Sequence, residues 1–127
     1  MPLTQHAMIV GRELAYHDYE GVVLDLDERV RLVKSLGKKH LMLLRNHGTL
    51  ALSPTCGGAW LLIYYLEQAC AMQLRAMSAT SDLLLPTEAV QARVRSQSDS
   101  WFDGSAGAYA WPGILDNLDS IDPSYRT

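Results

Sequence analysis

The stretch LLRNHGTLAL (43–52) carries Asn46, His47 and Gly48 between two apolar arms. A glycine inside a strand often marks a bulge or a close approach of the backbone. A histidine can bind a metal or move a proton near neutral pH. We therefore expect Gly48 to bend a strand so that His47 faces a pocket at the edge of a sheet. The alternative is a histidine whose ring is simply hydrogen-bonded.

A second polar stretch, YHDYEG (16–21), places His17 next to Asp18. Neutral imidazole and carboxylate are both suitable metal ligands, so these two residues are candidate helpers of His47. The alternative is a polar loop whose side chains bond to one another and to solvent. Glu67, inside a long apolar run, is either a proton-transfer group or a carboxylate that faces water or an interface.

Composition excludes several classes of protein. The 127 residues include 48% hydrophobic and 20% charged residues, as in a soluble globular domain. The net charge of −3 does not provide the basic surface that binds nucleic acid.

Cys56 and Cys70 fall on one expected helix, roughly 20 Å apart and too far for a disulfide. Free thiols and an N-terminus without a signal peptide predict a cytoplasmic protein. The polar residues of the longest apolar helix argue against a membrane span.

The periodicity of apolar residues, together with capping residues and glycines, predicts an α/β chain. Two strand-like pieces are expected around AMIV (7–10) and GVVL (21–24), and the clearest strand covers 40–52, apolar on both faces. A first helix begins at the capping box of Asp25 and Glu28, repeats apolar residues at Leu26, Val30, Val33 and Leu36, and ends at Gly37. The other elements are a long helix over 57–77 capped by Ser53, a shorter helix over 86–96, and a tail over 97–127 that packs on the body with one helical turn.

The segments GRELAYHDYEG (11–21) and LLRNHGTLALSPTCGGAWLLIYYLEQACAMQL (43–74) resemble the class II aldolase/adducin family. The whole chain is similar to the C-terminal half of that domain. The resemblance implies an α/β/α layer fold around a small mixed sheet, frequently assembled as a homo-oligomer. Enzymes of the family cleave or form carbon–carbon bonds in small hydroxylated substrates, or epimerise sugar phosphates. They hold a divalent metal, usually zinc, with three histidines, of which the NHG histidine corresponds to His47.

The sequence departs from the family pattern in one respect. Two of the family's metal ligands form a His-x-His pair in the first half of the domain, and the four histidines here (His6, His17, His40 and His47) include no such pair. The catalytic carboxylate and the phosphate loops also belong to that first half. We therefore expect residues 1–127 to be a single truncated domain with no assigned catalytic residue, and zinc to bind weakly or not at all to this chain alone.

Three functional hypotheses stay open. The chain is a metal-dependent lyase or epimerase-like protein, a non-catalytic interaction module of the adducin kind, or a remnant of a longer gene without either activity. We favour a family protein that does not catalyse by itself. A homo-oligomer is expected because half of the family sheet is missing, which leaves an edge strand and a helix face exposed. A small-molecule substrate is expected only if the site is completed.

Overall fold

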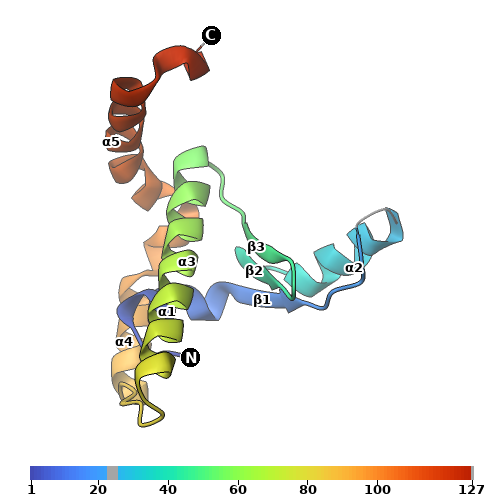
Figure 1. The fold of residues 1–127 in the computed structure, drawn as a ribbon, viewed down its shortest axis with the longest axis vertical. Helices are drawn as coiled ribbons and strands as arrows, with labels where there is room; N and C mark the ends of the chain where they lie inside the picture. The colour runs from blue at the N-terminus through green and yellow to red at the C-terminus, as the bar shows by residue number, and fades with distance from the viewer. Residues whose placement is uncertain (23–25, 127) are drawn as a thin grey trace.

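The computed structural model describes residues 1–22 and 26–126. It contains both helices and strands, as the α/β prediction requires (Figure 1). In chain order they are α1 (Gln5–Val10), the 3-10 helix η1 (Gly11–Glu13), β1 (Leu14–His17), α2 (Leu26–Leu36), β2 (Leu41–Leu44), β3 (Gly48–Ala51), α3 (Cys56–Ala79), α4 (Glu88–Gln97), η2 (Asp99–Asp103), α5 (Ser105–Ile121) and η3 (Pro123–Arg126).

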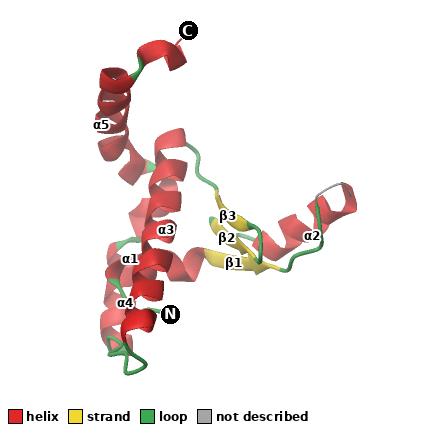
Figure 2. Ribbon diagram, in the orientation of Figure 1, coloured by secondary structure: helices red, strands yellow, loops and turns green. Residues whose placement is uncertain are grey.

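The three strands form a small mixed sheet in the order β1-β2-β3, enclosed by helices (Figure 2). β1 runs parallel to β2, and β2 runs antiparallel to β3. Leu41 and Met42, neighbours on the central strand, are both completely buried. Successive side chains of a strand point to opposite faces, so the sheet is covered on both sides and the expected α/β/α layering is confirmed.

Each face of the sheet has its own apolar cluster. On one face, Leu41 packs with α1, α3 and η2 through residues that include Val10, Leu62 and Leu66. On the other face, Met42 packs with Ala15 and with Leu36 of α2. The register pairs Ala15 with Met42 and His17 with Leu44. His17 is two residues from Ala15 on the same strand, so it points to the α2 face.

The first of the two strands expected near the N-terminus is a helix instead. AMIV forms most of α1, whose first turn is capped by Thr4: its Oγ1 accepts a hydrogen bond from the Ala7 N–H at 3.2 Å. Met8, Ile9 and Val10 are all buried because α1 contacts both α3 and α4. A four-residue apolar run does not distinguish a buried helix from a strand. Of GVVL, Gly21 and Val22 lie in a bend, and the rest falls outside the described residues.

The first expected helix forms, but it buries a different face from the one its apolar spacing indicates. Leu26, Val30 and Val33 are 74%, 70% and 62% exposed. The side of α2 that meets the sheet instead carries Glu28 and Leu36, both buried. The helix ends at Gly37 as predicted, with φ of +59° and a bond from its N–H to the Val33 carbonyl. The capping role of Asp25 concerns a residue outside those described.

The long helix α3 is confirmed, and several elements surround it. It contacts α1, β3 and α5, which cover part of its apolar circumference. Tyr64, Leu74 and Met77 on the same helix stay 44%, 65% and 50% exposed. Its cap is Thr55 rather than Ser53: the Gly58 N–H donates to Thr55 Oγ1 at 3.0 Å. Within the described part of the chain, none of the helices combines the length and apolar character needed to cross a bilayer.

The C-terminal region differs most from its prediction. Instead of a tail with one helical turn, residues Ser105–Ile121 form the 17-residue helix α5. Its first half crosses the start of α3 at glycines, and its second half projects away from the body (Figure 1). A Cβ added at Gly107 would lie only 2.2 Å from the Gly58 nitrogen. The two backbones therefore touch where a side chain would keep them apart.

Candidate functional site

His47 lies in the turn of a hairpin rather than in a continuous strand. The predicted strand over 40–52 is split into β2 and β3, and Leu44 pairs with Gly48 across the three-residue turn. The His47 N–H donates to the Leu44 carbonyl at 3.0 Å, and the imidazole is exposed. The turn is thus a short loop that presents His47 at one end of the sheet.

Asn46, and not Gly48, supplies the unusual backbone of this turn. Asn46 has φ of +57°, a left-handed conformation that asparagine tolerates better than most residues. Gly48 is not in that region, and a Cβ added to it would meet nothing within 4 Å. The expectation that Gly48 bends the strand is therefore wrong, because the reversal occurs before the glycine.

All three predicted site residues line one small cavity of about 50 Å³. His17 and His47 contribute imidazoles to it, and Asp18, Glu20 and Glu28 contribute carboxylates. β1, the residues that follow it, α2 and the hairpin turn bring them together. The sequence pointed to His47, His17 and Asp18 but missed both glutamates.

His17 is the buried member of the cluster, only 6% exposed. Its Nδ1 lies 3.0 Å from Ser35 Oγ, within hydrogen-bond distance. Its Nε2 lies 3.8 Å from Glu20 Oε1 and 3.8 Å from Glu28 Oε1, and it finds no hydrogen-bond partner among the described residues. The expected loop histidine is instead a strand residue between the sheet and α2. Glu28 shares a helix face with Leu32, Ser35 and Leu36, a spacing that was visible in the sequence.

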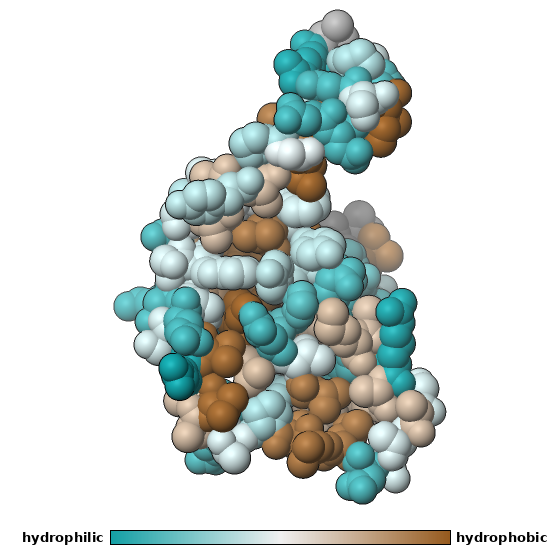
Figure 3. Space-filling model, turned by 90° about the vertical axis from the view of Figure 1, so that its left-hand side faces the viewer, coloured by the Kyte–Doolittle hydropathy of each residue, from teal (hydrophilic) through white to brown (hydrophobic). Residues whose placement is uncertain are grey.

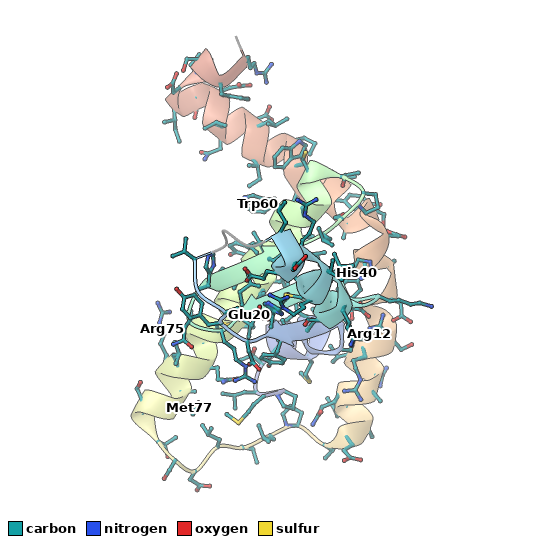
Figure 4. The ribbon with its side chains drawn as sticks, turned by 90° about the vertical axis from the view of Figure 1, so that its right-hand side faces the viewer. Arg12, Glu20, His40, Trp60, Arg75 and Met77 are labelled. Atoms are coloured by element: carbon teal, nitrogen blue, oxygen red, sulfur yellow. The ribbon has the colours of Figure 1, made fainter. Side chains whose placement is uncertain are left out.

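The other carboxylates at the cavity are engaged by arginines. Asp18 Oδ1 lies 2.9 Å from Arg45 Nε, and the Arg45 guanidinium stacks over the Tyr16 ring at 5.4 Å. Glu20 accepts from Arg31 Nε at 2.8 Å, and Figure 4 labels it in front of the sheet. Asp18 thus helps to hold the residues on both sides of the cavity.

The donor set around His47 does not fit a zinc site on its own. A catalytic zinc generally needs three protein ligands. Within residues 1–22 and 26–126, no three His, Cys, Asp or Glu side chains are arranged to hold a metal ion. His17 Nδ1 lies beside Ser35 Oγ, whereas its Nε2 has no hydrogen-bond partner among the described residues, and Asp18 is paired with Arg45. The assignment of His47 as a metal ligand stays a prediction from the resemblance.

A second polar cluster lies at the opposite end of the sheet, where β1 and β2 begin. His40 Nδ1 is 2.9 Å from Glu13 Oε2, and its ring packs against Phe102 at 5.5 Å. Arg12 pairs with Asp99 and lies over the same Phe102 ring. Figure 4 labels Arg12 and His40 near each other on one side of the molecule. His40 is half-buried because this cluster joins η1, the start of β2 and η2.

Glu67 and Cys70 both lie on α3. Glu67 is exposed and accepts a hydrogen bond from Thr49 Oγ1 at 2.7 Å, which ties α3 to β3. Cys70 lines an open cavity of about 520 Å³ between β1, α1, α3 and α4. Burial, with a smaller contribution from the Glu67 charge, raises the pKa of the Cys70 thiol. The thiol is therefore held in its protonated, weakly nucleophilic form.

Comparison with known proteins identifies the family. Residues 1–74 match the family described as "Class II Aldolase and Adducin N-terminal domain". The chain belongs to the class II aldolase/adducin family. The resemblance carried by the segments around His17 and His47 is thereby confirmed.

Class II aldolase/adducin proteins of known sequence or structure align with nearly all of the chain. A Caulobacter vibrioides protein named "Putative aldolase class 2 protein" is 50% identical over 126 residues, which are 98% of this chain and 49% of that protein. Alpha-adducin of Rattus norvegicus is 31% identical over 139 residues, which cover this whole chain and 18% of the adducin.

A solved structure shows the same arrangement. The crystal structure of an aldolase II superfamily protein from Pseudomonas syringae superposes with a TM-score of 0.92 at 38% identity, over 100% of this chain and 51% of that one. The chain therefore spans about half the length of this structure and of the Caulobacter relative.

Proposed function

We propose that this chain is a class II aldolase/adducin protein that does not catalyse as a lyase by itself, and that His47 serves as a metal ligand only when further ligands come from outside these 127 residues. The observation that carries the proposal is the exposed His47 ring on the hairpin turn. It lies at a cavity where the Asp18 carboxylate is paired with Arg45. The buried His17 ring has its Nδ1 beside Ser35 Oγ and its Nε2 3.8 Å from each of two glutamates.

Family membership supports a metal-directed role for His47, because class II aldolases generally depend on a metal. A single imidazole cannot supply the three-ligand geometry of a catalytic zinc. The Glu28 carboxylate beside His17 lines the same cavity as His47, and its negative charge would favour a cation there. We accordingly expect weak attraction of zinc to the turn and no aldol cleavage of sugar phosphates.

A zinc titration of the full chain tests the proposal. We expect the ring signals of His47 in ¹H–¹⁵N NMR spectra to move first, with half-saturation above the micromolar range, and to be absent from the His47→Ala spectrum. His6→Ala is the matched control, since His6 stacks on Tyr65 away from the turn and should not alter the response. Calorimetry measures the zinc affinity of the chain, and an assay of aldehyde release measures aldol cleavage.

Two results would contradict the proposal. Stoichiometric zinc with sub-micromolar affinity that is lost in His47→Ala would mean that the chain completes a metal site without help. Equally tight zinc that persists in His47→Ala would place the metal elsewhere and remove the role of His47.

A non-catalytic interaction module, as in adducin, is the second candidate. The similarity to alpha-adducin over the entire chain favours it. Absence of any His47 shift at millimolar zinc, together with an inactive protein, is the result expected for this candidate.

A further inference from the structure

The open cavity of about 520 Å³ between β1, α1, α3 and α4, called here the α3 cavity, lies on the face of the sheet opposite α2. Its volume falls within the range of small-molecule sites in proteins, about 300–1,000 Å³. Most of its walls are apolar and include Met8, Leu14 and Leu66. Neither His17 nor His47 lines it, so it is separate from the cavity at the hairpin turn. The α3 cavity thus has the size and the walls of a site for an apolar molecule.

The charged side chains that line the α3 cavity are those of Arg12 and Arg95, and no aspartate or glutamate is among the described residues that line it. The charge of Arg12 is already compensated, because Arg12 pairs with Asp99 and its Nε lies 3.5 Å from Glu13 Oε1. Arg95 is half-buried on α4 and forms no ion pair with any residue that the structure describes. The wall of the α3 cavity therefore carries one uncompensated positive charge.

The other polar residues at the cavity do not oppose this charge. Gln91 lies one helical turn before Arg95 on the same face of α4, and its Nε2 donates to the Pro86 carbonyl at 2.8 Å. The thiol of Cys70 stays protonated at neutral pH, because burial raises its pKa. Glu67, the carboxylate of α3, does not line the cavity and accepts its hydrogen bond from β3. An anionic group is therefore the complement of this wall.

We propose that the α3 cavity binds a small amphiphilic carboxylate, of the class of medium-chain fatty acids, with its carboxylate paired to Arg95 and its hydrocarbon chain against β1 and α3. The guanidinium offers a fork of N–H donors that matches the two oxygens of a carboxylate. The apolar walls remove the hydrocarbon chain from water, which is the main favourable term for such a ligand. This binding goes beyond the metal role proposed for His47 and does not depend on it.

The test measures the binding of octanoate to the full chain by calorimetry, with octanol as a neutral probe of the same chain length. We expect saturable binding of one octanoate per chain, weakened about tenfold in Arg95→Gln, as for the loss of a charge-assisted hydrogen bond. Octanol should bind equally to the wild type and to this variant. Arg93→Gln is the matched control, because Arg93 is exposed on the same helix and does not line the cavity, and its affinity for octanoate should match the wild type.

Alkylation of the two cysteines locates the bound molecule. Cys70 lines the α3 cavity, whereas Cys56 is exposed at the start of the same helix and lies outside the cavity. Octanoate should therefore slow the reaction of Cys70 with N-ethylmaleimide and leave that of Cys56 unchanged, as measured by peptide mass spectrometry. Hydrophobic residues also gather on the surface, at the end of the body away from the C-terminal arm (Figure 3). Leu84→Asn is the control for adsorption to exposed apolar surface, since Leu84 is 92% exposed and outside the cavity, and it should bind octanoate as the wild type does.

Three results would overturn the inference. The first is the absence of saturable octanoate binding up to millimolar concentration, as expected if a polypeptide segment fills the cavity instead. The second is an Arg95→Gln variant that binds octanoate as tightly as the wild type, which would mean that the carboxylate is not recognised there. The third is octanoate binding that leaves the alkylation rate of Cys70 unchanged, which would place the ligand outside the α3 cavity.

Discussion

The glycine contact between α3 and α5 leads to a quantitative prediction. A Cβ at Gly107 would lie 2.2 Å from the Gly58 nitrogen and 2.3 Å from the Gly57 carbonyl carbon. These are backbone atoms, so no rotamer change relieves the overlap, and the helices must separate by roughly 1 Å to reach van der Waals contact. Overpacking of this kind costs about 1–3 kcal/mol. Alanine recovers about 0.5–1 kcal/mol as the better helix former, which leaves Gly107→Ala destabilised by roughly 1 kcal/mol and by at most about 2.5 kcal/mol.

Gly113→Ala is the matched control on the same helix, because a Cβ there meets nothing within 4 Å. It should stabilise α5 by about 0.5–1 kcal/mol, so the two variants should differ by about 2 kcal/mol in urea unfolding. Chymotryptic cleavage within α5 measures the detachment of the helix directly, since Trp111 is partly covered against Gly57. We expect faster cleavage in Gly107→Ala. If Gly107→Ala instead stabilises the protein as much as Gly113→Ala does, the backbones do not meet at these glycines.

Two further predictions concern the hairpin and the histidines. Asn46→Val should destabilise the protein by about 1–2 kcal/mol, since a β-branched residue is strained at positive φ, while Gly48→Val should stay within about 0.5 kcal/mol of the wild type. Urea unfolding measures the loss of stability in both variants. A larger loss for Gly48→Val than for Asn46→Val would mean that Gly48, and not Asn46, adopts the strained backbone conformation. His17→Ala should cost about 1–3 kcal/mol because it empties a buried position and leaves Ser35 and Glu28 without their neighbour. The exposed His47→Ala should change the free energy of unfolding by less than about 0.5 kcal/mol, and equal losses for both histidines would contradict the burial of His17.

The sequence determined those features whose signals are local. The long apolar run of α3 and the start of α4 at Thr87 follow from periodicity and capping, which act over a few residues. Gly37 ends α2 for the same reason, because only its own backbone needs the left-handed conformation. The NHG element and the segment around His17 likewise sufficed to indicate the family.

The tertiary structure alone decided how the apolar faces are used. The spacing of Leu26, Val30 and Val33 is that of a buried face, yet the sheet covers the side of α2 that carries Glu28 and Leu36. The spacing of apolar residues in a sequence can predict that a helix forms. Which side of that helix becomes buried depends on the elements that pack against it.

The candidate site was accessible to sequence reasoning only in part for the same reason. His47 stood out by its motif, whereas the contacts of His17 with Ser35 and the two glutamates depend on how α2 crosses the end of β1. The hairpin at Asn46 could not be predicted, because apolar segments on both sides of it are compatible with one long strand as well as with two paired strands. The sequence did not predict α5 as a helix, because glycine and proline within it have low helix propensity. The first turns of α5 are held by a backbone contact with α3 that only the folded chain provides.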